Sequence, residues 1–226
     1  MKLERLPIAV FVLSFVGVAV SLWLARSFEL VPHCRVFIDG CHSISAAGRQ
    51  EPAVFVFRGT IIPTGMVLIL VWWLTTNWLR ELGAGRTPRF FIHLLGTASP
   101  VLLIAYIALV GSQGEIDHAI RQTVITTYFP ATLLAKIITA ICLLKLCPPT
   151  IPRWLPVIML VIAIAVLGVA ASSVVFTQLL DDPSTAHNLL QWNGTTAFSA
   201  WYLLLWIAWR RTGLAVAPTI DPDTRA

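Results

Sequence analysis

The chain has 226 residues, of which 57% are hydrophobic and only 12% are charged. A soluble globular domain carries about 25% charged residues, so this composition excludes an ordinary water-soluble fold and indicates a membrane protein. The formal net charge of +5 would suggest a nucleic-acid partner in a soluble protein. Here the cations lie between apolar segments instead of forming one basic patch, which indicates membrane topology and argues against nucleic acid as a partner.

Six apolar runs predict transmembrane helices, because about 20 apolar residues are needed to cross the hydrocarbon core of a bilayer. The runs cover residues 6–25, 61–79, 93–111, 123–146, 155–176 and 191–209. The stretches before the second and fourth runs, residues 53–57 and 117–122, contain no Gly or Pro, so both helices are expected to begin before their runs. The predicted fold class is all-α: a polytopic membrane helix bundle with six transmembrane helices in residues 1–211, followed by a disordered tail at residues 212–226.

The distribution of Lys and Arg predicts the orientation of this bundle. Nine such side chains lie beside membrane ends on the side of the N-terminus: Lys2, Arg5, Arg80, Arg86, Arg89, Lys145, Arg153, Arg210 and Arg211. Five lie on the opposite side: Arg26, Arg35, Arg49, Arg58 and Arg121. Because cations near membrane ends are enriched in the cytoplasm, we expect both termini inside (N-in, C-in) and the long loop at residues 26–60 outside.

The long loop contains two cysteines, each with a histidine beside it, in His33-Cys34 and Cys41-His42. Outside the cytoplasm, this spacing favours a disulfide between Cys34 and Cys41. A zinc site built from the same four residues is the alternative, although zinc ligand pairs usually have tighter spacing. The interpretation that we adopt has no metal and no other cofactor.

Histidines and acids gather on the predicted outer face. They are His33, His42, His118, His187, Asp39, Asp117, Asp181 and Asp182. If these side chains converge, they suit general acid–base or metal-assisted hydrolysis of an ester at the lipid headgroup layer. The alternative is that polar residues in exposed loops have no joint role. Ser43 and Ser45 are candidate nucleophiles, although they lack a G-x-S-x-G motif.

Lys136 lies near the centre of the fourth apolar run. A lysine at the middle of a bilayer costs at least about 2.5 kcal/mol, so it is expected to face the bundle or a wet cavity and to have a partner. One interpretation is a contact with a lipid phosphate or a transported anion. The other is an internal pairing with backbone carbonyls, or with a polar side chain such as Asn77, Tyr106 or Asn193.

Three segments of the chain resemble the Frag/DRAM/Sfk family of six-helix membrane proteins. The first is CHSISAAG at residues 41–48, followed by Glu51-Pro52 and Phe57-Arg58. The second is EIDH at residues 115–118, followed by Tyr128-Phe129, and the third runs from Gln191-Trp192 to Trp201-Tyr202. The last helix often carries a glutamate in this family, whereas this chain has Ser199 to Trp201 in that region.

The resemblance implies lipid handling on the lumenal or periplasmic side, which better-studied members connect with lipid remodelling or delivery for GPI anchors. We therefore expect a membrane protein that binds, remodels or presents a phospholipid or glycolipid at the outer leaflet. The expected catalytic residues are His118, Asp117, Ser43 and Ser45. The expected lipid-binding residues are Arg58, Lys136, His42 and Trp192.

Two other functions remain open. The chain is alternatively a non-catalytic membrane scaffold or regulator that docks a membrane protein partner through the external loop. A third hypothesis is a small-solute transporter, which rests on Lys136. In each case, the expected location is a bacterial inner membrane or a eukaryotic secretory membrane.

Overall fold

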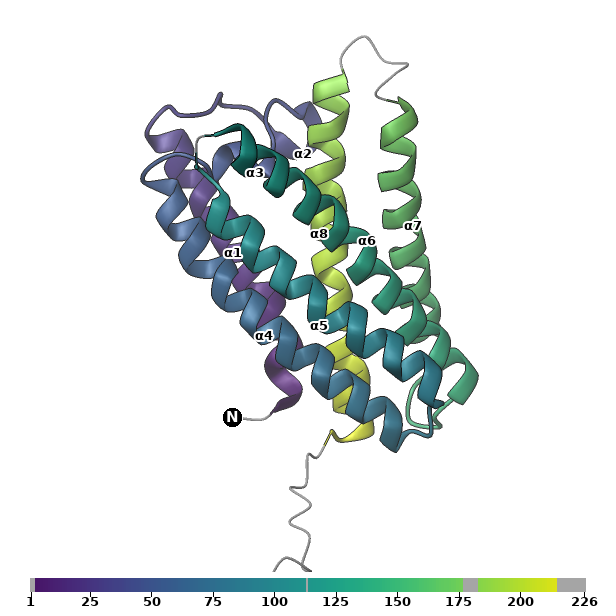
Figure 1. The fold of residues 1–226 in the computed structure, drawn as a ribbon. Coiled ribbons are helices and arrows are strands. Elements are labelled where there is room, and N and C mark those ends of the chain that lie inside the picture. The colour runs from purple at the N-terminus through teal and green to yellow at the C-terminus, as the bar shows by residue number, and fades with distance from the viewer. Residues whose placement is uncertain (1–2, 113, 177–182, 215–226) are drawn as a thin grey trace, which may run out of the picture.

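The structure is a computed structural model that describes residues 3–112, 114–176 and 183–214 (Figure 1). Its secondary structure consists of helices, and no strand occurs within these ranges. The elements are η1 (Leu3–Arg5), α1 (Leu6–Ser27), α2 (Val36–Asp39), α3 (Ile44–Ala47), α4 (Ala53–Glu81), α5 (Arg86–Leu109), α6 (Glu115–Leu146), α7 (Trp154–Phe176) and α8 (Pro183–Thr212). The all-α prediction is confirmed, whereas nearly all of the predicted tail, residues 215–226, lies outside the described residues.

Five of the six long helices are long and apolar enough to cross a membrane: α1, α4, α5, α6 and α7. They fit an integral membrane protein. The sixth, α8, is long enough at 30 residues but has a polar first half, with Gln191 and Asn193 among its side chains. The early starts expected for the second and fourth helices are confirmed, because α4 begins at Ala53 and α6 at Glu115.

The long helices run alternately up and down, and each packs against its neighbours in sequence (Figure 1). Contacts between α1 and α8 close the ring of helices. The start of α1 and the end of α8 lie at one end of the bundle (Figure 1). The other end carries α2, α3 and the starts of α6 and α8, and we call it the loop end.

Hydroxyl groups inside these helices obtain their hydrogen bonds locally. The buried hydroxyls of Thr75, Thr132 and Thr139 each donate to the backbone carbonyl four residues earlier in the same helix, at 2.7 to 2.9 Å. A hydroxyl in apolar surroundings without a partner is costly. These bonds therefore allow threonines to lie inside the bundle without a partner on another helix.

Large aromatic side chains fill the centre of the bundle. Trp72 on α4 stacks on Trp201 of α8, with ring centroids 6.0 Å apart, and both side chains are fully buried. The Trp201 indole N–H donates to the Met159 carbonyl of α7 at 3.1 Å. A Cβ atom at Gly96 would lie 2.6 Å from the Trp72 ring, so glycine at this position lets α5 approach the core.

Candidate functional site

Residues 34–48, which we call the cystine loop, fold into two short helices beside α8. Cys34 and Cys41 form a disulfide, with Cα atoms 6.5 Å apart, and this confirms the predicted pairing. Gly40 ends α2 in the left-handed conformation, with φ of 60°, which favours glycine. Ser43 caps α3, because its hydroxyl accepts a hydrogen bond from the Ala46 N–H at 3.1 Å.

Polar side chains at the start of α8 hold the cystine loop in place. Trp192 donates to the His42 carbonyl at 2.9 Å, and Asn188 donates to the Gly40 carbonyl at 2.8 Å. Asn193 donates to the Phe37 carbonyl at 3.1 Å. The polarity that makes α8 less apolar than its neighbours therefore has a structural use, which is to bind the backbone of the loop.

His42 is buried between the disulfide and α8. Its side chain is only 6% exposed, and its ring meets that of Trp192 edge to face. Burial lowers the pKa of His42 below its ordinary value; the contact of Nδ1 with the Ser43 carbonyl opposes this shift, and the charge of Arg26 adds to it. The Nε2 atom is buried without a hydrogen-bond partner among the described residues. Protonation of His42 is therefore disfavoured in the folded protein.

Within the described residues, one cluster of side chains brings three possible metal-ligand atoms close together, and it lies in the cystine loop. These atoms belong to Cys34, Cys41 and His42 and lie within 4.8 Å of one another. Zinc binds cysteine as the thiolate. Because the two sulfur atoms are joined as a disulfide, this arrangement fits a covalent crosslink and not a metal site.

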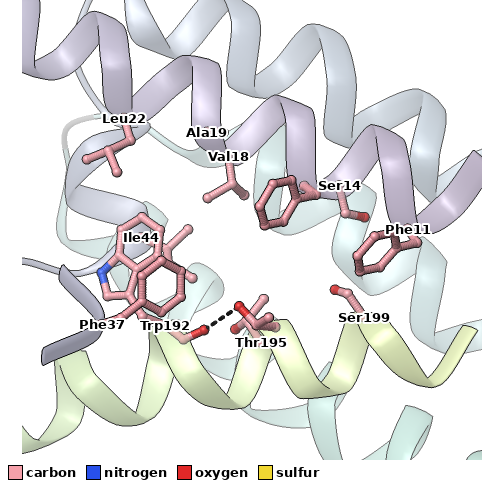
Figure 2. A pocket seen from close by; sticks show the side chains of 12 residues that line it. Phe11, Ser14, Val18, Ala19, Leu22, Phe37, Ile44, Trp192, Thr195 and Ser199 are labelled. Carbon is pink, nitrogen blue, oxygen red and sulfur yellow. Dashed lines mark hydrogen bonds between the residues drawn. The ribbon is translucent and has the colours of Figure 1, made fainter. Parts of the chain in front are cut away.

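A cavity of about 100 Å³ lies between α1 and α8 below the cystine loop. Figure 2 shows Phe11, Ser14 and Val18 of α1 facing Thr195 and Ser199 of α8 across it. Phe37 and Ile44 of the cystine loop and Trp192 of α8 complete the end nearest the loop. The walls are therefore formed by the first and last helices of the chain, with mostly apolar side chains.

A second cavity, of about 150 Å³, shares the wall residues Ser14, Thr195 and Ser199 with the first and extends among the other helices. Its lining includes Ser45 of the cystine loop and Tyr106 of α5, together with many apolar and aromatic side chains. The two cavities together form a mainly apolar space with polar groups at the loop end.

The two candidate serines lie at this polar end. The hydroxyl oxygens of Ser43 and Ser45 are 3.1 Å apart, and Ser45 lines the second cavity. No hydrogen bond joins either serine to His118 or Asp117 in the described chain. His118 is exposed and Asp117 half-buried in the first turn of α6. The structure thus brings the serines together but does not show a histidine positioned as their general base.

The wider convergence of outer-face histidines and acids is not seen in the described ranges. His187 lies 2.8 Å from the Gln191 amide on its own helix, and Asp39 pairs with Arg35 at 3.5 Å. Asp181 and Asp182 lie outside the described residues. Among the described residues, His187 and Asp39 thus have separate local partners, and a joint role of the outer-face histidines and acids in ester hydrolysis stays a prediction.

Two arginines hold the turn after α5 at the loop end. Arg58 donates through Nη2 to the Val110 carbonyl. Arg121 donates through Nη1 to the Leu109 carbonyl at 3.0 Å and to the Ser112 carbonyl at 2.7 Å. Arg58, which was expected to bind lipid, thus lies beside a second cation that the sequence did not single out.

Lys136 is fully buried on α6 and faces α8. Its ammonium donates to the Phe198 carbonyl at 2.6 Å and lies 3.3 Å from the centroid of the Phe198 ring. The Tyr202 ring centroid is 4.4 Å away. Phe198 and Tyr202 line the second cavity, whereas Lys136 is not among its lining residues. Of the two interpretations, the structure contains the internal pairing with a backbone carbonyl, reinforced by cation–π contacts.

The sequence did not identify several residues that shape this site. Tyr106 appeared only as a possible partner of Lys136. Ser14 was not singled out, although a polar side chain inside the first apolar run could have indicated a polar contact within the bundle. Nothing in the sequence paired the first run with the last. The cavity wall could therefore not be predicted.

Comparison of the chain with family models, with curated protein sequences and with solved structures found no significant match.

Proposed function

We propose that this chain is an integral membrane protein that binds a lipid from the leaflet at its loop end, as a lipid carrier or presenter. The observation that carries the proposal is the mainly apolar space between α1 and α8, which has Ser45 and Tyr106 at its loop end. The apolar walls match the chemistry of an acyl chain, and the polar groups suit the ester and headgroup region. We also propose that the chain is related to the Frag/DRAM/Sfk family, on the basis of the three segments that resemble it. That relationship would imply the same kind of ligand.

The proposed topology has six membrane crossings with both termini in the cytoplasm. For α8, the support is its position in the closed ring, because it packs against both α1 and α7. For the orientation, the support is the disulfide, since such bonds persist on the oxidising side of a membrane. The free thiols of Cys142 and Cys147 lie near the far end of α6, which fits a reducing compartment on that side.

Binding is favoured over catalysis. Ser43 already caps α3, and the Nδ1 atom of His42 lies 3.3 Å from a backbone carbonyl and is not bonded to a serine hydroxyl. The transporter hypothesis depended on Lys136, which is enclosed by aromatic side chains of α8. The scaffold hypothesis has no comparable contact in its favour among the described residues.

Filling the space between α1 and α8 tests the proposal. In Ser14→Phe, the new ring would occupy the region that both cavities share, whereas Val16→Phe on the same helix places a ring on a surface that is 47% exposed. We expect mass spectrometry of the purified protein to find a bound lipid in the wild type and in Val16→Phe, and little or none in Ser14→Phe. Ser199→Phe fills the same space from α8 and should have the same effect.

The proposal is wrong if the wild-type protein carries no lipid in native membranes or mild detergent. It is also wrong if both filling variants fold and retain as much lipid as Val16→Phe. Thermal unfolding of each variant in detergent shows whether it is folded, so that a loss of lipid is not confused with a loss of structure.

A further inference from the structure

The loop end of the bundle holds three arginines around the turn at residues 109–112. Arg58 on α4 and Arg121 on α6 donate to backbone carbonyls of this turn from two different helices. The third, Arg49, reaches it through its backbone: a Cβ atom at Gly111 would lie 2.9 Å from the Arg49 carbonyl oxygen and 3.8 Å from Nη2 of Arg58. Two helices therefore bring positive charge to this turn, and the backbone of Arg49 lies beside it.

These arginines have donors left over after the bonds to the turn. A guanidinium carries five N–H groups. Arg58 uses Nη2, while its Nε is buried without a hydrogen-bond partner in the described chain, and Arg121 uses Nη1. The ion pairs described within 4.0 Å, Arg35–Asp39 and Arg80–Glu81, do not involve these arginines.

Stabilisation of the carboxyl end of α5 explains part of this arrangement. Cations are favourable near the last carbonyls of a helix. That role accounts for one bond from each of Arg58 and Arg121, but not for the buried unpartnered Nε or for Arg49, whose side chain is exposed. The remaining donors form an array suited to an anion with several oxygen atoms, such as a phosphate.

The arginines are connected with the second cavity through Tyr106. This tyrosine lines the cavity and lies one turn of α5 before Leu109, whose carbonyl accepts from Arg121. On α4, Phe57 lines the same cavity and directly precedes Arg58. The loop end of the cavity therefore lies close to the two arginines that bind the turn.

We propose that the bound lipid has a net negative, phosphate-bearing headgroup, and that Arg49, Arg58 and Arg121 bind its phosphate while an acyl chain occupies the space between α1 and α8. This inference rests on the proposed lipid-binding function and adds the headgroup class. A zwitterionic lipid brings its own cation to the arginines, and a neutral lipid brings no charge. Both should therefore bind less tightly than the anionic lipid.

The test measures binding of single-chain lipids of equal chain length to the purified full-length protein in a neutral detergent. The probes are lysophosphatidic acid and lysophosphatidylglycerol, compared with lysophosphatidylcholine and a monoacylglycerol. Because a hydrogen bond to a charged group contributes about 1.5–3 kcal/mol, we expect the anionic lipids to bind at least about tenfold more tightly than the other two.

Charge-removing variants assign the preference to these residues. Arg58→Gln and Arg121→Gln should each weaken binding of the anionic lipids about tenfold more than binding of the monoacylglycerol. Arg35→Gln is the matched control on the same face, because Arg35 is 75% exposed and pairs with Asp39. It should retain the wild-type preference. If either glutamine variant fails to fold, Arg49→Gln decides, since that side chain is exposed and has no described hydrogen bond.

The outcomes separate this inference from the proposed function. If no single-chain lipid binds, the lipid-binding proposal itself is wrong. If all four lipids bind equally, or if the preference survives in Arg58→Gln, Arg121→Gln and Arg49→Gln, only the headgroup inference is overturned. Inorganic phosphate is the remaining probe: if it displaces the lipid at equal concentration, the site binds free phosphate and the assignment to a lipid headgroup is wrong.

Discussion

Trp192 donates its indole N–H to the backbone carbonyl of His42 at 2.9 Å, and the rings of the same two residues meet edge to face with centroids 6.1 Å apart. One residue of the last helix thus binds both the backbone and the side chain of a residue 150 positions earlier. This contact fixes the cystine loop over the space between α1 and α8, and it can be tested directly.

Trp192→Phe should loosen the cystine loop. Phenylalanine retains an aromatic ring but cannot donate to the His42 carbonyl, and the loss of one such bond costs about 1 kcal/mol. We expect faster trypsin cleavage after Arg35 and Arg49 in detergent. Trp23→Phe, at a side chain that is 64% exposed on α1, is the control and should leave the cleavage rate unchanged. Equal cleavage rates in the two variants would contradict this role of Trp192.

Removing the disulfide should destabilise the protein. The double variant Cys34→Ser/Cys41→Ser frees a short loop, and the chain-entropy argument gives a loss of about 2 kcal/mol in the free energy of unfolding. The measurement is thermal unfolding of the variant and of the wild type with and without a phosphine reductant. The reductant should lower the Tm of the wild type but not of the variant, and Cys147→Ser should behave as the wild type. A wild-type Tm that is insensitive to the reductant would count against a structural disulfide.

Acid should weaken the folded protein through His42. Burial holds the pKa of His42 below its ordinary value in the folded state, whereas the unfolded chain takes up the proton near pH 6.5. The free energy of unfolding therefore receives no contribution from this group above about pH 6.5 and falls as the pH drops below that value, until His42 is also protonated in the folded state. Tm measured from about pH 8 to about pH 5 should show a shallower acid slope in His42→Gln than in the wild type or in the exposed-residue control His33→Gln. Equal slopes in all three would refute the assignment.

The size of Lys136 should matter more for stability than its charge. Lys136→Ala leaves a void under α8 and should cost about 2–5 kcal/mol in equilibrium unfolding from mixed micelles. Lys136→Met keeps most of the volume and removes a buried cation, so its free energy of unfolding should stay within about 1 kcal/mol of the wild type, or rise above it. A loss in Lys136→Met as large as that in Lys136→Ala would show that the ammonium contacts with Phe198 are essential.

The six long helices could be predicted because their apolar runs are separated by polar or proline-containing segments. The first run, residues 6–25, agrees with α1 at Leu6–Ser27 to within two residues at either end. The last run was predicted from residue 191, whereas α8 begins at Pro183. The first turns of α8, before residue 191, contain polar side chains such as Asn188, which binds the cystine loop. A hydropathy pattern cannot distinguish such a polar helical segment from a loop.

Only part of the candidate site was predicted from the sequence. The family-like segment that contains His42, Ser43 and Ser45 does lie at the loop end beside the cavity. The wall formed by α1 and α8 was missed, because contacts between the first and last helices leave no trace in local periodicity. Pairing of Lys136 with a backbone carbonyl was one of the two predicted interpretations, but Phe198 could not be named as the partner, because a backbone carbonyl is available at every residue and has no sequence signature.

The aromatic enclosure of Lys136 has a consequence for the synthesis of the protein. The lysine lies on α6, but the carbonyl and the rings that surround its ammonium belong to α8. Phe198 follows Lys136 by 62 residues, so α8 is synthesised after α6. Until then α6 carries an unpaired cation, which a bilayer centre tolerates poorly. We therefore expect a chain truncated before α8 to be less stable in the membrane than the complete bundle and to be degraded faster.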